Sequence, residues 1–158
     1  ALEAAMKFAK NPSGWLFLCG RPGIGKSHLA AAIANDMLSQ KKLVLFLNVP
    51  ELLSFLRAGF HSQQGGVPDF DKRLQTIRDF PVLILDDWGA HSDTPWADEQ
   101  LYLILNYRTE HVLPTVVTTN LPLNSLEPRI RSRLSNRRIG NVIKVSAPEE
   151  GDYRTAEL

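Results

Sequence analysis

The stretch GRPGIGKSHLA, Gly20 to Ala30, places three glycines and a proline in front of a lysine, a serine and a helix-forming run. It satisfies the pattern G-x-x-x-x-G-K-[ST], with an apolar run before it and an amphipathic helical pattern after it. Glycines let backbone N–H groups converge on a phosphate, and the N-terminus of the following helix adds partial positive charge. The stretch therefore predicts a phosphate-binding loop, and a plain glycine-rich turn is the less favoured alternative.

The side chains of this loop have separate expected tasks. Lys26 is expected to reach the β- and γ-phosphates, and Ser27 to ligate Mg²⁺. The residues expected to bind the nucleotide are Gly20, Pro22, Gly23, Ile24, Gly25, Lys26, Ser27 and His28. The predicted cofactors are thus ATP or ADP and Mg²⁺.

Short apolar runs recur along the chain, at residues 15–19, 43–49, 82–85, 115–119 and 141–145. Most are apolar throughout rather than alternating, which is typical of parallel strands covered on both faces. Helical patterns lie between them, so the chain is predicted to be an α/β protein with a parallel sheet. Its 158 residues suit a single domain, 1–158, and we find no linker that would divide it.

Helix boundaries follow from prolines, glycines and capping residues. Pro50 suits a first helical turn and Gly59 the end of that helix, after which residues 61–69 are predicted to form a flexible surface loop. Asn124 as N-cap, with Glu127 three residues later, predicts a helix over about 125–134.

Composition excludes several classes of protein. Hydrophobic residues at 44% and charged residues at 22% are ordinary for a soluble globular chain. No apolar run approaches the roughly 20 residues of a membrane-spanning helix, and no leader is evident, so we expect a cytoplasmic protein without a membrane partner. Cys19 stands alone and is expected in the core, and the four histidines show no metal-binding spacing.

Two acids follow an apolar run in VLILDDWG, residues 82–89. A P-loop enzyme needs a second magnesium anchor at the end of another strand, so Asp86 is assigned to the metal and Asp87 to the attacking water. An Asp-rich turn is the alternative. Asn120, after the run TVVTT, could hold a γ-phosphate oxygen or the water, although Asn at this position is also a common turn residue.

Basic residues concentrate in one segment although the net charge is only +1. Residues 129–144 carry six basic side chains and no acidic one. An NTPase stabilises charge on the transferring phosphoryl group with an arginine, which a neighbouring subunit can supply. Arg133 is the candidate for this arginine finger and Arg129 the second choice. Solvation, or contact with nucleic-acid phosphates, is the alternative.

The ordered set GRPGIGKSHLAAAIAND, VLILDDWGA, PTVVTTN and PRIRSRL resembles the AAA+ ATPase domain of bacterial replicative helicase loaders of the DnaC/DnaI type, with the related transposition helper IstB. The resemblance implies a three-layer, ASCE-type P-loop fold with five parallel strands in the order 5-1-4-3-2. Asn120 matches the family's sensor 1 position, and Arg133 matches its trans-acting arginine. Assembly into a ring or spiral is implied with it.

The resemblance also implies partners. Single-stranded DNA would contact Phe60, Thr94 and Trp96, since bases of any identity stack on aromatic rings. Core packing of Phe60 and Trp96 is the alternative. A DnaB-type helicase would bind through a region outside these residues, because the chain begins at Ala1 without Met and is expected to be a fragment.

The expected activity is a slow ATPase, stimulated by assembly or DNA, that loads the helicase in replication initiation or restart. The alternatives are an IstB-like transposase helper acting on duplex DNA, a small-molecule kinase and a binding module without turnover. Asp87 stands where many AAA+ proteins have Glu, which leaves the rate of hydrolysis open. Only thirteen residues follow Val145, so the helical lid is expected to be reduced or absent, without an assignable sensor 2.

Overall fold

The structure is a computed structural model that describes residues 1–60, 63–64, 67–90, 94–126, 128–134 and 140–144. Its five main strands are β1 (Trp15–Cys19), β2 (Leu45–Asn48), β5 (Leu83–Trp88), β6 (Thr115–Thr119) and β7 (Gly140–Lys144). Its α-helices are α1 (Leu2–Lys10), α2 (Lys26–Ser39), α3 (Val49–Ala58), α4 (Asp69–Asp79), α5 (Pro95–Glu110) and α6 (Pro128–Leu134).

The main strands form one parallel sheet in the order β2-β5-β6-β1-β7. Read from the other edge, and counting only these strands, this is the order 5-1-4-3-2, so the predicted topology is confirmed. β6 lies between β1, which leads into the glycine loop, and β5, which carries the two acids. Their carboxyl ends therefore meet at one edge of the sheet.

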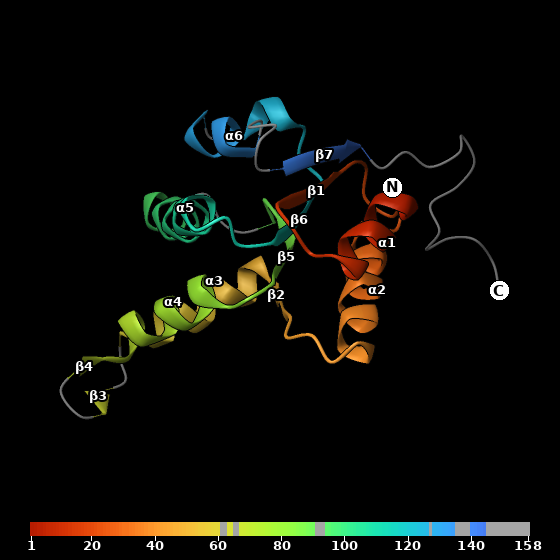
Figure 1. Cartoon of the computed structure of the whole chain (residues 1–158). Coiled ribbons are helices and arrows are strands. Elements are labelled where there is room, and N and C mark those ends of the chain that lie inside the picture. Colours follow the sequence, from red (N-terminus) through yellow and green to blue (C-terminus); the bar gives the residue numbers. More distant parts are fainter. Residues whose placement is uncertain (61–62, 65–66, 91–93, 127, 135–139, 145–158) are drawn as a thin grey trace.

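Helices cover both faces of the sheet (Figure 1). α1 and α2 pack on one face against Leu16, Leu18, Ile84 and Val116, among others. On the other face, α3, α4, α5 and α6 pack against residues that include Phe17, Leu83, Leu85 and Val117. Successive strand residues point to opposite faces of the sheet. Because both faces are covered by helices, the strands are apolar at successive positions rather than alternating. The predicted three-layer architecture is confirmed.

Several element boundaries differ from the predicted ones. β2 is shorter than the predicted run 43–49: it begins at Leu45, and it ends at Asn48 because the chain enters α3 directly at Val49. The predicted loop 61–69 contains the short antiparallel pair β3 (Gln63–Gln64) and β4 (Val67–Pro68), and α4 begins at Asp69. The predicted helix 125–134 is wrong at its start. A 3₁₀ turn, η1 (Leu123–Ser125), precedes α6, which begins at Pro128 because proline is best tolerated at the first helical position.

Gly59 ends α3 as predicted, but not by adopting a left-handed conformation. Its φ is −65°, which any residue can adopt. A Cβ atom there would lie 2.8 Å from both the backbone N and Cα of Phe70. Glycine is needed because the end of α3 approaches the start of α4 this closely.

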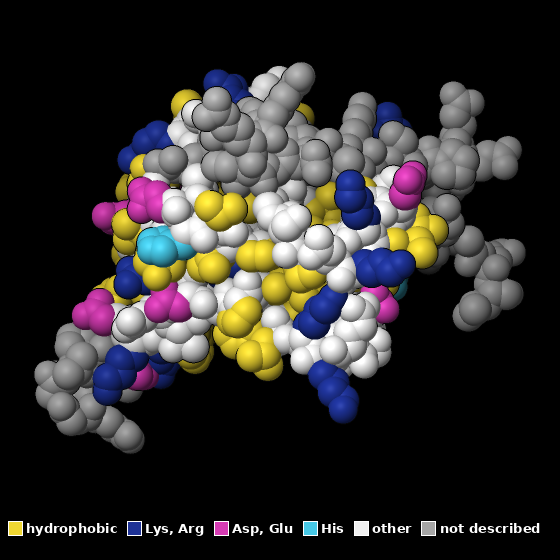
Figure 2. All heavy atoms as spheres, viewed as in Figure 1, with side chains coloured by type: hydrophobic (Ala, Val, Ile, Leu, Met, Phe, Trp, Pro, Cys, Tyr) yellow, Lys and Arg dark blue, Asp and Glu magenta, His cyan; other side chains and the backbone are white. Residues whose placement is uncertain are grey.

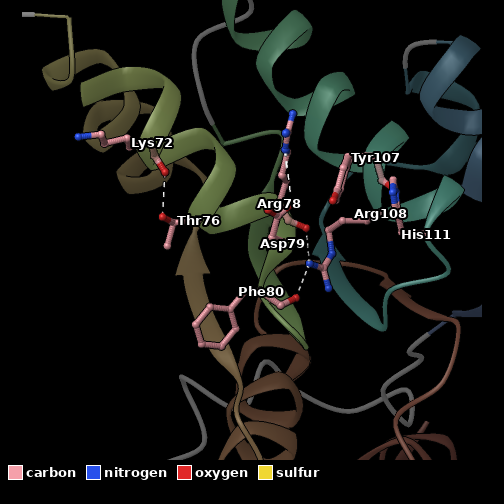
Figure 3. A network of polar contacts seen from close by, with 8 residues as sticks. All are labelled: Lys72, Thr76, Arg78, Asp79, Phe80, Tyr107, Arg108 and His111. Atoms are coloured by element: carbon pink, nitrogen blue, oxygen red, sulfur yellow. Dashed lines mark hydrogen bonds and ion pairs between the residues drawn. The ribbon is translucent and has the colours of Figure 1, made fainter. Parts of the chain in front are cut away.

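A buried arginine joins the elements at the amino ends of β5 and β6 (Figure 3). Arg108 of α5 is fully buried and donates hydrogen bonds to the carbonyl oxygens of Arg78, Phe80 and Pro114 at 2.6–2.9 Å. Its Nε donates to Thr115 Oγ1 at 2.8 Å. Burial lowers the pKa of Arg108 to about 10, so the guanidinium stays charged at neutral pH. One side chain thus holds the C-terminal end of α4, α5 and two strands together.

Figure 2 shows that the surface seen in the view of Figure 1 carries both apolar and charged side chains. Apolar side chains are exposed between the α3–α4 and α1–α2 parts, and Lys and Arg side chains lie over α1 and α2. Within the described ranges, no helix is both long and apolar enough to cross a bilayer. The predicted lid region, after Val145, lies outside the described residues.

Replacing Arg108 with Met should lower the free energy of unfolding by about 2–4 kcal/mol, because buried oxygen acceptors lose their donor. Urea unfolding followed by circular dichroism measures this. Arg131→Met is the control, since Arg131 is exposed and should change stability by less than about 0.5 kcal/mol. Equal urea midpoints for the two variants would contradict the role given to Arg108.

Candidate nucleotide site

The glycine loop forms the wall of a cavity at the carboxyl edge of the sheet. Gly23 and Gly25 have φ values of 81° and 87°, in the left-handed region that favours glycine. Gly25 is the N-cap of α2, which begins at Lys26. The cavity has a volume of about 290 Å³. Its lining residues are Pro22, Gly23, Gly25, Lys26, Ser27, His28, Asp87, Thr118 and Asn120.

Lys26 lies at the centre of this wall. Lys26 is only 6% exposed, and its Nζ donates hydrogen bonds of 2.7 Å to Arg21 O and to Asn120 Oδ1. These bonds hold the ammonium group at the end of β6, next to the first turn of α2. A phosphate group in the cavity would compete with these two oxygens for the protons of Lys26.

The two acids of β5 lie at different depths. Asp87 lines the cavity, whereas Asp86 is 8% exposed and does not line it. Thr118 Oγ1 donates a hydrogen bond of 2.6 Å to Asp86 Oδ1 and accepts one of 3.0 Å from Asp87 N. Asp86 therefore does not reach the cavity itself. It is hydrogen-bonded to Thr118, which lines the cavity.

Asn120 connects the lysine with the second acid. Its Oδ1 accepts from Lys26, and its Nδ2 donates to Asp87 Oδ1 at 3.1 Å. The structure thus brings together Lys26, Asp87 and Asn120, which are far apart in the sequence. Sequence reasoning missed Thr118, although the polar end of TVVTTN was a signal that more than Asn120 faces the site.

The end of β6 also contacts the end of β5 outside the cavity. Thr119 Oγ1 donates to Trp88 O at 2.7 Å and accepts from Leu121 N at 3.0 Å. Gly89 has a φ of 94°, and a Cβ atom there would lie 2.4 Å from Leu121 Cδ1. Thr118 and Asn120 therefore contact the two acids, whereas Thr119 contacts only the backbone after them.

The donor set suits Mg²⁺ bound together with phosphates. Ser27 and Asp87 supply oxygen atoms at the cavity wall, and Asp86 stands behind it. Magnesium keeps several waters and takes one or two carboxylates rather than a complete protein cage. The described residues contain no group of three or more His, Cys, Asp or Glu able to hold a metal.

The other residues predicted for the site lie around it. Gly20 and Ile24 belong to the loop but do not line the cavity, and Gly20 N donates to Thr119 O at 3.3 Å. Arg129 is exposed, with its guanidinium 4.7 Å from the ring centre of Tyr102. Arg133 belongs to α6, but its side chain lies outside the described structure.

The predicted DNA-contact aromatics form one cluster. The ring of Phe60 stacks on that of Phe70 at 4.4 Å and lies 6.2 Å from that of Trp96. The guanidinium of Arg57 lies 4.8 Å from the ring centre of Trp96, and Phe60 is 53% exposed. Thr94 is the N-cap of α5, where its Oγ1 accepts from Ala97 N at 3.2 Å. A structural role thus accounts for Thr94.

Comparison with known families agrees with this geometry. The sequence profile of the IstB-like ATP binding proteins matches residues 3–131. The chain belongs to this family. A crystal structure of DnaI superposes with a TM-score of 0.73 and 31% sequence identity, covering 97% of this chain and 82% of that one. The fold is thus the AAA+ P-loop fold that the resemblance implied.

Two curated relatives are replicative helicase loaders. DnaI of Bacillus subtilis is 33% identical over 113 residues, which cover 71% of this chain and 35% of that protein. DnaC of Escherichia coli K12 is 28% identical over 146 residues, which cover 92% of this chain and 58% of that protein. The chain therefore spans between about a third and three fifths of the length of these relatives.

Replacing Gly89 with Ala should lower the free energy of unfolding by about 2–4 kcal/mol, through left-handed strain and the contact with Leu121. Gly25→Ala is the matched control. It has the same strain but no atom within 4 Å of the new Cβ, so about 1–2 kcal/mol is expected. In a Leu121→Ala background the cost of Gly89→Ala should fall to that of the control. The free energy of unfolding of all variants is measured by chemical denaturation without nucleotide. If Gly89→Ala costs as much in the Leu121→Ala background as in the unmodified chain, the close contact between Gly89 and Leu121 is contradicted.

Proposed function

We propose that this cavity binds Mg²⁺-ATP and that the domain hydrolyses it. The observation that carries the proposal is the meeting of a P-loop lysine, a strand-end acid and an amide in one hydrogen-bonded chain, Lys26–Asn120–Asp87. Family membership supports nucleotide binding. The cavity of about 290 Å³ suits the phosphates, with the backbone N–H groups at the start of α2 adding positive potential.

Each residue then has one task. Lys26 would turn from Arg21 O and Asn120 Oδ1 toward the β- and γ-phosphates, and Ser27 and Asp86 would hold the metal. When bound, Mg²⁺ neutralises charge on the β- and γ-oxygens. Asp87 orients the attacking water and accepts its proton, while Asn120 keeps the Asp87 carboxylate directed toward the cavity.

Lys26→Ala should weaken binding of a fluorescent ATP analogue by at least about tenfold, because the phosphates lose a charge-assisted donor. Asp87→Asn should keep binding within about threefold but lower steady-state phosphate release by about 100-fold. Lys10→Ala, which removes an exposed lysine of α1, is the control for both assays. Equal turnover in Asp87→Asn and the unmodified chain would exclude Asp87 as the residue that activates water.

At the level of the whole protein, the function that fits best is that of a replicative helicase loader acting in replication initiation or restart. The names of the two curated relatives support this. ATP binding would favour an assembled ring or spiral that holds single-stranded DNA, and hydrolysis with an arginine of a neighbouring subunit, Arg133 or Arg129, would release it. A DnaB-type helicase would bind through a region outside these residues.

The aromatic cluster is the surface proposed for DNA. Phe60 and Trp96 lie far apart in the sequence, yet their ring centres are 6.2 Å apart. Arg57 adds positive charge beside Trp96, as single-stranded DNA sites require for the phosphates. Bases of a duplex are already stacked, so this arrangement favours single strands.

Trp96→Ala should weaken ATP-dependent binding of labelled single-stranded DNA by about tenfold, since stacking contributes about 1–3 kcal/mol per base. Fluorescence anisotropy with ATP, with ADP and without nucleotide measures it. Phe55→Ala removes an exposed aromatic side chain of α3 that lies outside the cluster, and it should have no effect. Preference for duplex DNA would instead support a transposase helper of the IstB kind, and equal loss in both variants would argue against the cluster.

A further inference from the structure

We infer that Thr118 is the positioning residue of this site, setting both acids of β5 with one hydroxyl group. The inference rests on the proposed function, because it concerns how Asp86 and Asp87 serve Mg²⁺-ATP. Thr118 is 1% exposed, belongs to β6 and lines the cavity. It is not one of the groups that the glycine loop or the acid pair predicts.

The direction of both hydrogen bonds is fixed by chemistry. The Asp87 N–H can only donate, so Thr118 Oγ1 accepts at 3.0 Å. The hydroxyl proton is then directed to Asp86 Oδ1, 2.6 Å away, within the range of a charge-assisted O–H···O bond. With Oδ1 held, the rotation of the Asp86 carboxylate is fixed, and so is the direction in which Oδ2 points.

The second bond stabilises an unusual backbone. The pairing of β5 with β6 shifts register between Leu85 and Trp88, and Asp87 has a φ of 59°, which is uncommon for a residue other than glycine. The shift takes the Asp87 N–H out of the regular ladder, and Thr118 provides its acceptor. This conformation presents the Asp87 side chain to Asn120 and the cavity. Loss of the hydroxyl would therefore disturb both acids at once.

The neighbouring residue provides a matched control. Thr119 is 0% exposed, and its hydroxyl also donates one hydrogen bond and accepts one, but its partners are the backbone groups of Trp88 and Leu121. Thr118 and Thr119 point to opposite faces of the sheet. Thr119→Val thus removes a buried threonine hydroxyl from the same strand without touching a carboxylate.

The test compares Thr118→Val, Thr118→Ser and Thr119→Val with the unmodified chain. Valine keeps the shape of threonine without its hydroxyl, and serine keeps the hydroxyl. Three quantities are measured: the affinity for fluorescent ADP in EDTA and over a Mg²⁺ titration, kcat and KM for ATP at saturating Mg²⁺, and hydrogen exchange of the Asp87 amide by NMR without nucleotide or metal.

Thr118→Val should bind ADP in EDTA within about twofold of the unmodified chain. Its half-maximal Mg²⁺ concentration should rise about tenfold or more, as for loss of other outer-shell partners of metal ligands. Its kcat should fall about tenfold with KM for ATP nearly unchanged, and its Asp87 amide should exchange at least about tenfold faster. Thr118→Ser should restore most of each value, and Thr119→Val should leave the Mg²⁺ requirement unchanged.

Two results would overturn the inference in distinguishable ways. If the unmodified chain shows Mg²⁺-dependent nucleotide binding and Thr118→Val matches Thr119→Val in Mg²⁺ requirement, kcat and Asp87 exchange, Thr118 is only a structural residue. If the unmodified chain shows no Mg²⁺-dependent binding, the proposed function falls, and the inference falls with it, even when the Asp87 amide is protected by Thr118.

Discussion

The parallel pairing of β5 with β6 is the constraint on which the site depends. Hydrogen bonds along the strands set the register, and the polar ends of the strands then lie side by side. Without this pairing Asp86 and Asp87 would have no contact with Thr118 or Asn120, which are about thirty residues later. The next pairing, β6 with β1, adds the glycine loop and Lys26 to the same edge. Three elements that are distant in the sequence thereby form one cavity wall.

The opposite edge of the sheet shows how the register is held. Arg108 binds three carbonyl oxygens and Thr115 where β5 and β6 begin. A buried charge is tolerated only when it is hydrogen-bonded, and here the partners are three backbone oxygens and the Thr115 hydroxyl. Next to Arg108, the ring of Tyr107 lies between the guanidinium of Arg78 and the ring of His111 (Figure 3). A hydrogen bond with Asp79 raises the pKa of Tyr107. Fixed starting points for both strands give their distant ends a reproducible alignment.

The sequence predicts much of this because the strands and the P-loop carry local signals. Apolar runs without alternation predict a parallel sheet covered on both faces, and the glycine pattern locates the phosphate loop. The strand order came from the family resemblance, since no local signal states which strands are neighbours. Thr118 and Arg108 could not be found in this way: a threonine in a strand and an arginine in a helix are ordinary until the fold shows what they contact.

The contacts of Lys26 also give the proposed ATP switch a physical basis. Asn120 Oδ1 accepts from Lys26 while Asn120 Nδ2 donates to Asp87, so the amide responds to both groups. A γ-phosphate would compete with Asn120 Oδ1 for the lysine protons, whereas with a diphosphate the contact between Lys26 and Asn120 would persist. The orientation of the amide, and with it that of the Asp87 carboxylate, would then depend on whether the third phosphate is bound.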